Sequence, residues 1–273
     1  MGCDSGPSRL PYAMNLAYDA CKADLKLQPT IFLSDGWADL YKQPEPKIWA
    51  SLGLRDKLKL IESHASKVIA KFMPIRDRCT YYQIGNEIDY GLCGIFAHDK
   101  KKRRDHEWLK RRIWPLEAMM LKEVIRIIRM YDEKPIALHL GKWWDLVLSE
   151  SFLSTMDEFD VGYEIVCFSF YPAMFGSGFD HLGQLMEIAK RRGKAMAIAE
   201  YAYPSKLPKG LFWYMNKPSA GYPLTPEGQS SWIRDFLTQC LKSNICGAFY
   251  WSPELYLTKY DGNGVPNEMP LGF

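Results

Sequence analysis

The chain has 273 residues, 47% of them hydrophobic and 25% charged, which is typical of a globular protein with a sizeable core. This length fits one large domain or two small ones, and α/β barrels commonly fill it as a single domain. The net charge of +3 is too small to indicate a nucleic acid or an anionic membrane as partner. No apolar run approaches the roughly 20 residues of a membrane span.

The N-terminal sequence MGCDSG has no apolar stretch, so we expect no signal peptide in this chain. The seven cysteines are scattered without CxxC spacing, which argues against a zinc ribbon or a redox motif. We interpret them as small buried hydrophobic residues. Aromatic residues make up 14% of the chain, which is a modest indication of a stacking surface.

Strand-like and helix-like segments alternate along the chain. Apolar and β-branched runs predict strands at residues 29–35, 81–88, 135–141, 165–172, 194–201 and 245–253. Amphipathic spacing predicts helices at residues 9–25, 55–72, 114–131, 181–192 and 226–243. Apolar strands separated by helices indicate a parallel sheet covered on both faces. No linker or repeat interrupts this pattern, so we expect one domain over residues 1–273.

The run DKKKRRDHEWLKRR at residues 99–112 is the one dense charge block. We interpret it as a solvated loop that leads into a helix. A nucleic-acid patch is the alternative, but no second basic run or aromatic RNA-binding box accompanies the block. We therefore expect no nucleic-acid partner and, without an apolar span, no membrane partner.

Polar and aromatic residues occupy the carboxyl ends of several predicted strands. They are Asp35, Asn86, Glu87, His139, Tyr171, Glu200 and Trp251. Such side chains at the ends of many parallel strands are typical of a (β/α) barrel, whose active site lies at that face. A doubly wound sheet gathers them at one switch point and usually has a glycine-rich phosphate loop, which this sequence lacks. The sequence therefore predicts an α/β fold of the (β/α) TIM-barrel type.

Two of these residues are carboxylates that end similar strands. Glu87 follows YYQIGN, and Glu200 follows AMAIA. Two carboxyls on one barrel rim can cleave a glycosidic bond, because one protonates the leaving oxygen while the other attacks the sugar or activates water. Asn86 would then hydrogen-bond a sugar hydroxyl. The alternative is that one of the two glutamates only forms a salt bridge with a rim Lys or Arg.

Other chemistries have little support in the sequence. HExxH and clusters of His or Cys are absent, so we expect no metal and no cofactor. GxSxG is absent too, which argues against a serine hydrolase. His139 stands alone on an apolar strand, where a hydrogen-bonded core histidine is more common than a catalyst.

The motifs together resemble glycoside hydrolase family 53, the endo-β-1,4-galactanases. The matching segments are SDGWADLYKQPEPKIWASL, QIGNEI, FSFYPAMF, AIAEYAYP, YPLTPEGQ and GAFYWSPELY, which run in the family's order from about Leu10 to Tyr256. This resemblance implies a retaining enzyme of the (β/α)8 clan with catalytic glutamates on strands four and seven. By motif, Glu87 matches the acid/base and Glu200 matches the nucleophile.

The resemblance also implies residues that bind the sugar or orient the catalysts. Tyr171 falls where the clan often has a tyrosine that orients the nucleophile, and Trp251 matches the strand-eight tryptophan under the scissile sugar. Asp35, Trp37 and Asp39 match the family's Ser-Asp-x-Trp-Ala-Asp loop. We also expect His139, Trp143 and Trp144 to contribute to the substrate site, with Trp37, Trp143, Trp144 and Trp251 stacking on sugar rings.

The sequence departs from the family at several points. Phe32 and Leu33 replace a His-Tyr pair, DYGLCGIF replaces the residues that follow the acid/base, and Trp-Ser-Pro replaces Trp-Glu-Pro near Trp251. The family's strands one and two have no counterpart, so about six of eight β/α units are expected, with the barrel incomplete at its N-terminus. Residues 28–35 should then form an exposed sheet edge.

The leading functional hypothesis is a retaining endo-glycosidase, acting as a monomer on β-1,4-galactan, the arabinogalactan backbone, or on a related plant polysaccharide. The alternative is a catalytically impaired carbohydrate-binding barrel or a truncated fragment of such an enzyme. The resemblance implies a secreted or cell-envelope protein, although the chain itself carries no recognisable signal peptide.

Overall fold

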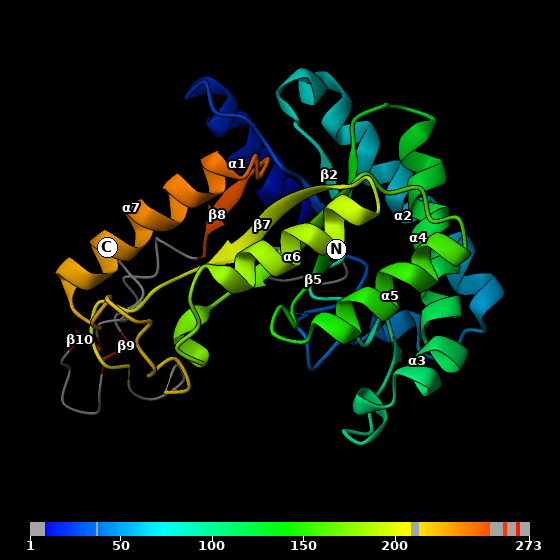
Figure 1. The fold of residues 1–273 in the computed structure, drawn as a ribbon. Helices are drawn as coiled ribbons and strands as arrows, with labels where there is room; N and C mark the ends of the chain where they lie inside the picture. The colour runs from blue at the N-terminus through cyan, green and yellow to red at the C-terminus, as the bar shows by residue number, and fades with distance from the viewer. Residues whose placement is uncertain (1–8, 37, 209–212, 252–258, 261–265, 268–273) are drawn as a thin grey trace. The chain divides into compact units, whose positions relative to one another are not determined.

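The structure is a computed structural model that describes residues 9–36, 38–208, 213–251, 259–260 and 266–267. Figure 1 shows the ribbon. The chain divides into two compact units between Cys167 and Phe168. None of the described helices is both long and apolar enough to cross a membrane.

The first unit contains most of the helices that the sequence predicts. Its helices are α1 (Leu10–Lys22), α2 (Leu54–Phe72), α3 (His106–Arg112), α4 (Trp114–Arg129) and α5 (Leu146–Glu158), with short 3₁₀ turns η1 (Lys47–Trp49), η2 (Met73–Arg78) and η3 (Lys102–Arg104). Its strands are β1 (Thr30–Ile31), β2 (Tyr82–Ile84), β3 (Gly91–Leu92), β4 (Ile95–Phe96) and β5 (Ile136–Leu140). Strand β6 (Ile165–Phe170) crosses the division between the units.

The second unit continues the alternation of strands and helices. Its elements are η4 (Pro172–Met174), α6 (Asp180–Arg191), β7 (Ala195–Tyr201), α7 (Pro226–Lys242), β8 (Ala248–Tyr250), β9 (Lys259–Tyr260) and β10 (Pro266–Asn267). Helix α7 begins as its sequence predicts, because the Thr225 side chain accepts the backbone N–H of Gly228 and Pro226 occupies the first turn.

The six predicted strands are all present in one sheet, in the order β1-β2-β5-β6-β7-β8. In the first unit β1, β2 and β5 pair in parallel and in a shared register, with Thr30 opposite Gln83 and Gln83 opposite Ala137. Strands β2 and β5 are buried along their whole length. Burial on both faces is what a parallel sheet covered by helices requires, so the sequence interpretation of the sheet is confirmed.

The core of the first unit lies between its helices and the sheet. Helices α2 and α4 lie side by side (Figure 1), and Ile61, Ile69, Leu121 and Val124 on their inner faces have no exposed surface. Burying such aliphatic side chains stabilises the fold by about 1.5–3 kcal/mol each relative to leaving them exposed. The loops after β2 and β5, which pair with each other in the sheet of this unit, carry the candidate site.

The core of the second unit is largely aromatic. Trp232 of α7 stacks on Tyr203 and on Phe236, with ring centroids 4.9 Å and 4.8 Å apart, and Phe236 also stacks on Phe170. Trp232 and Phe236 are buried. Much of the aromatic content of this unit is therefore packed inside it and does not form a stacking surface.

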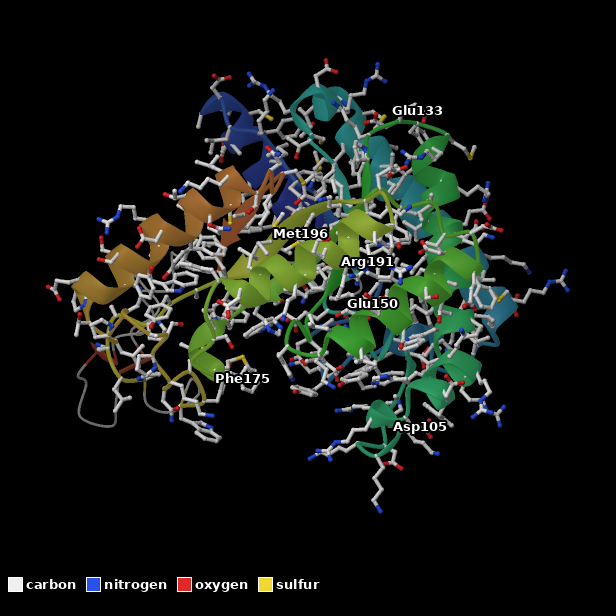
Figure 2. All side chains as sticks on the ribbon, viewed as in Figure 1. Asp105, Glu133, Glu150, Phe175, Arg191 and Met196 are labelled. Atoms are coloured by element: carbon white, nitrogen blue, oxygen red, sulfur yellow. The ribbon has the colours of Figure 1, made fainter. Side chains whose placement is uncertain are left out.

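Of two segments between the predicted strands, one was missed by the prediction and the other follows it. Helix α5 was not predicted, although Asp145 caps it by accepting the backbone N–H of Leu148. The charge block at 99–112 does lead into a helix, α3, where Asp105 accepts the backbone N–H of Trp108 (Figure 2 labels Asp105).

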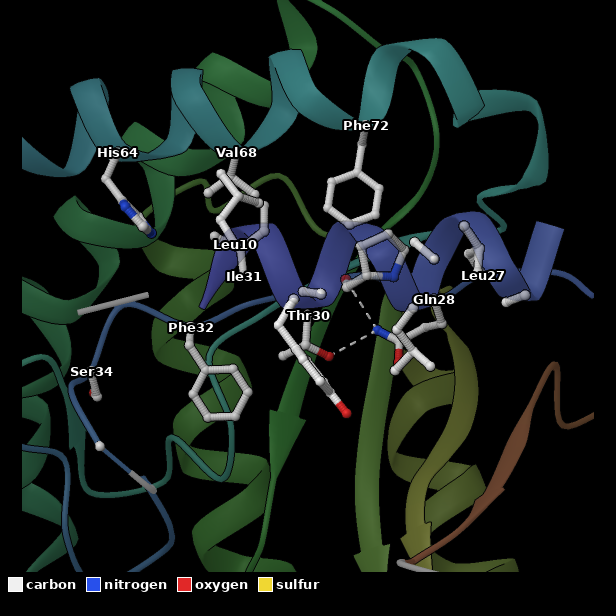
Figure 3. A pocket seen from close by; sticks show the side chains of 17 residues that line it. Leu10, Leu27, Gln28, Thr30, Ile31, Phe32, Ser34, His64, Val68 and Phe72 are labelled. Atoms are coloured by element: carbon white, nitrogen blue, oxygen red, sulfur yellow. Dashed lines mark hydrogen bonds between the residues drawn. The ribbon is translucent and has the colours of Figure 1, made fainter. Parts of the chain in front are cut away.

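Strand β1 lies at the edge of the sheet, as the sequence predicts, but the expectation that residues 28–35 are exposed is wrong, because each of them is buried or half-buried. Strand β1 has only two residues, and Ile31 and Leu33 are 2% exposed. Helix α1 lies beside β1 and α2, and the three segments line an apolar cavity of about 410 Å³ (Figure 3). Phe32 also lines this cavity. Helix α1 thus covers much of the surface that the sequence left open.

Candidate active site

The chain turns sharply where β2 ends. Gly85 and Glu87 both have positive φ angles, +71° and +51°. Glycine adopts this left-handed conformation freely, and a Cβ at Gly85 would lie 2.5 Å from Ile88 Cγ2. For Glu87 the same conformation costs about 1–2 kcal/mol. Backbone strain of this kind persists only where surrounding contacts impose it, and it is concentrated at functional sites.

The Glu87 side chain is held between two backbone segments. Its Oε2 accepts the backbone N–H of Leu40 at 2.9 Å. On another side it lies against Gly141, since a Cβ added there would be 2.6 Å from Glu87 Cδ. Because an N–H can only donate, Oε2 is the acceptor, and this hydrogen bond fixes the orientation of the carboxyl group.

Asn86 and His139 lie beside Glu87, as the sequence predicts, and they contact each other. His139 Nδ1 is 3.1 Å from Asn86 Oδ1 and 3.2 Å from Gln83 Nε2, while Asn86 Nδ2 donates to the Ala38 carbonyl. Burial lowers the pKa of His139 to about 3, so the ring is neutral. His139 has no exposed surface. The prediction that it contacts substrate is therefore not supported, and its position suits orienting Asn86.

The tryptophans after β5 differ in exposure. Trp144 is half-buried, whereas Trp143 has no exposed surface. The prediction that Trp143 stacks on a sugar ring is wrong for this structure, because no face of its indole is open. The rings of Trp143 and Trp144 meet edge to face at 5.9 Å, so Trp143 supports its neighbour. Trp37 lies outside the described residues.

The loop after β1 places Asp35 and Asp39 in local turns. The Asp35 carboxylate accepts the N–H of Gly36, and the Asp39 carboxylate accepts the N–H of Tyr41 at 2.8 Å. Both aspartates are half-buried. Asp39 thereby shapes the tight turn whose Leu40 N–H reaches Glu87.

Three buried polar residues near Glu87 were missed by the sequence reasoning. Gln43 donates to the carbonyls of the Glu87 loop, and Asp89 accepts the N–H groups of Gly141 and Lys142 at 2.7 and 2.9 Å. Burial raises the pKa of Asp89 to about 6. Burial, together with the charge of Asp89, raises the pKa of Glu117 well above its usual range. Asp89 lies two residues after Glu87 and was visible as a candidate, but nothing local distinguished Gln43 or Glu117.

In the second unit Glu200, Tyr171 and Trp251 come together. Tyr171 donates its hydroxyl to Glu200 Oε2 at 2.6 Å, the hydrogen bond that the resemblance implies. The Tyr171 ring meets the Trp251 ring edge to face at 6.4 Å, and the Trp251 backbone N–H donates to the Tyr201 carbonyl. Glu200 lies at the carboxyl end of β7, and all three residues are half-buried. A donor aimed at a carboxylate favours its ionised form.

The model for glycosyl hydrolase family 53 matches residues 1–269. The chain belongs to this family. Over 92% of its length it is 24% identical to an endo-beta-1,4-galactanase of Bacillus subtilis (strain 168), and it covers 57% of that protein. It is 27% identical to an uncharacterized protein in the bgaB 5' region of Niallia circulans, over 86% of this chain and 66% of the relative. The chain thus spans less than two thirds of either relative.

Solved structures agree on the fold. The chain is similar to the Ignisphaera aggregans GH53 catalytic domain with a TM-score of 0.74 and 23% identity, covering 89% of this chain and 67% of that domain. It is also similar to a fungal β-1,4-galactanase structure with a TM-score of 0.78 and 22% identity, covering 94% and 76%. The protein is therefore an incomplete (β/α) barrel, with six strands of the main sheet among its described residues.

Proposed function

We propose that this protein is a retaining endo-glycosidase that hydrolyses β-1,4-linked galactan by double displacement, with Glu87 as acid/base and Glu200 as nucleophile. The observation that carries the proposal is the hydrogen bond from Tyr171 to Glu200. It gives one strand-end carboxylate the donor that an ionised nucleophile needs. Family membership and the galactanase names of its relatives support the substrate class.

In the first step Glu200 attacks the anomeric carbon while Glu87 protonates the departing glycosidic oxygen. The Leu40 N–H donates to Glu87 Oε2 and would hold the carboxyl in one orientation during proton transfer. In the second step Glu87 removes a proton from water as that water displaces the sugar from Glu200. Retention requires the two carboxyls to stand about 5–5.5 Å apart across the substrate, and this separation is a prediction.

The half-buried residues around Glu87 and around Glu200 are the ones that can contact substrate. Trp144 and Trp251 can present ring faces to sugars, since neither ring is fully buried. Asn86, Asp35 and Asp39 remain candidates for hydrogen bonds to sugar hydroxyls. His139 and Trp143 are proposed to support Asn86 and Trp144 from behind.

The test is a reducing-sugar assay on β-1,4-galactan, with β-mannan as the comparison polysaccharide. We expect the protein to release oligosaccharides from galactan and Glu200→Ala to abolish release. Azide should restore turnover of an activated aryl galactoside by Glu200→Ala. A protein that binds galactan without cleaving it would contradict the proposal and favour the impaired carbohydrate-binding barrel.

A further inference from the structure

The strained backbone of Glu87 needs contacts that hold it. Glu87 lies in the left-handed region at φ +51°. The neighbouring peptide groups offer two carbonyl oxygens, those of Asn86 and Glu87, one on either side of the Glu87 Cα. A donor that reaches both carbonyls would fix the turn.

Gln43 supplies this donor. Its Nε2 is 2.6 Å from the Asn86 carbonyl oxygen and 3.3 Å from that of Glu87, and the same nitrogen is 3.2 Å from the Asp39 carbonyl oxygen. The side chain is only 2% exposed, so water does not compete with these hydrogen bonds. The amide therefore ties the turn of residues 39–42 to the backbone of Glu87.

The other end of the Gln43 amide is also fixed. Its Oε1 accepts the hydroxyl of Ser34 at 2.6 Å, and that hydroxyl oxygen accepts the backbone N–H of Cys93 at 2.9 Å. The backbone carbonyl of Gln43 also accepts a hydrogen bond, from the backbone N–H of Gly94. The nitrogen of the side-chain amide therefore donates and its oxygen accepts. Only a group with both a donor and an acceptor can make these contacts, and together they set the orientation of the amide.

The turn that Gln43 anchors also touches the reactive carboxyl. Leu40, within that turn, donates its N–H to Glu87 Oε2. A single segment therefore restrains both the backbone and the carboxylate of Glu87. A displacement of the turn would move the carboxyl and lose the donor together.

We propose that Gln43 is a positioning residue that aims the acid/base Glu87 at the leaving oxygen. This inference rests on the proposed function of Glu87 and concerns a residue 44 positions earlier (87 − 43). Without the Gln43 amide, Glu87 would keep its carboxyl group, but the carboxyl would be poorly oriented toward the leaving oxygen. Steps that need strong acid assistance should then suffer more than steps that need little.

The test compares kcat/KM for two aryl β-galactobiosides, because kcat/KM reports the first chemical step. A phenyl leaving group needs protonation, whereas a dinitrophenyl group leaves with little help. We expect Gln43→Ala and Gln43→Glu to lower kcat/KM by roughly 100-fold for the phenyl substrate and by less than about 10-fold for the dinitrophenyl substrate. The Gln43→Glu deficit should shrink at low pH, where the introduced carboxyl is protonated and can donate one hydrogen bond.

Gln28→Glu is the matched control. Gln28 is half-buried in the same unit, and its Nε2 donates to the Pro29 carbonyl and to Thr30 Oγ1, away from the Glu87 loop (dashed in Figure 3). Gln28→Glu should leave the ratio of kcat/KM for the phenyl substrate to kcat/KM for the dinitrophenyl substrate unchanged. Equal losses on both substrates in the Gln43 variants, or losses equal to those of the control, would overturn the proposal.

A crystal structure of Gln43→Ala separates this inference from the proposed function. We expect Glu87 to leave the left-handed region or its Oε2 to move away from the Leu40 N–H. If both features persist, Gln43 does not position Glu87, whatever the activity. If the unmodified protein hydrolyses neither galactobioside, the proposed function fails, and the crystal structure still decides whether Gln43 sets the geometry of Glu87.

Discussion

Gly141 gives a direct steric test of how Glu87 is placed. A Cβ at this position would stand 2.6 Å from Glu87 Cδ and 2.8 Å from both its Cβ and its Cγ. Carbon atoms in contact prefer about 3.5–4.0 Å, so Gly141→Ala should push the carboxyl by about 1 Å. A shift of that size stretches the 2.9 Å hydrogen bond from Leu40 beyond hydrogen-bonding distance.

We expect a large loss of activity and a moderate loss of stability. A misplacement of about 1 Å can cost roughly 100-fold in rate. The broken Leu40 hydrogen bond costs about 0.5–1.5 kcal/mol of folding free energy. Replacing glycine by alanine stabilises the folded state by about 0.4–1 kcal/mol, because alanine lowers the conformational entropy of the unfolded chain. The contact with Glu87 Cβ adds an overpacking cost of about 1–3 kcal/mol, so the free energy of unfolding should fall by about 0.5–4 kcal/mol.

The assay is kcat on galactan, measured beside urea unfolding of the same preparation. Gly183→Ala is the control, because a Cβ at this α6 position meets no atom within 4 Å. That variant should keep full activity and gain about 0.5–1 kcal/mol of stability. Full activity in Gly141→Ala, or a loss explained by unfolding alone, would refute the placement of Glu87 against Gly141.

Three further changes follow from the same contacts. Tyr171→Phe removes the donor to Glu200, so kcat/KM should fall about 10- to 100-fold and the acidic limb of the pH–rate profile should move to higher pH; an unchanged profile would count against the contact. Glu87→Ala should retain the first step for dinitrophenyl substrates and lose it for galactan, as single-turnover kinetics would show. Because the pKa values of Glu117 and Asp89 are both raised in the fold, the free energy of unfolding should decline as pH rises above their unfolded values, and Glu117→Leu should reduce that decline to the part that Asp89 contributes in urea titrations from pH 4 to pH 8.

The amphipathic helices could be predicted from sequence because their signals are local. Helices α2, α4, α6 and α7 begin and end within two residues of the predicted ranges. Helix α5 was missed because its Ser, Thr and Leu residues obscure a single apolar stripe, although its capping residue Asp145 was readable. Strand β1 ends at Ile31, short of the predicted residue 35, and the Asp35 N–H bonds the Pro44 carbonyl outside the sheet.

In the candidate site, too, local motifs could be predicted from the sequence and contacts between distant segments could not. The pairing of Tyr171 with Glu200 and the closeness of Asn86 to Glu87 could be inferred from motifs. The role of Gln43 could not, because its contacts with the Glu87 loop join segments 43 and 44 residues apart. The burial of Trp143 likewise depends on packing, which no local pattern in the sequence reports.

The central claim is double displacement by Glu87 and Glu200, and the anomeric form of the first product tests it most directly. Proton NMR during hydrolysis of β-1,4-galactan by the unmodified protein should show the β-anomer first, with the α-anomer appearing only through mutarotation. Glu200→Ala with azide and an activated aryl galactoside should yield the α-galactosyl azide. An α-anomer as the first product of the unmodified protein, or unchanged hydrolysis by Glu200→Ala, would contradict the assignment.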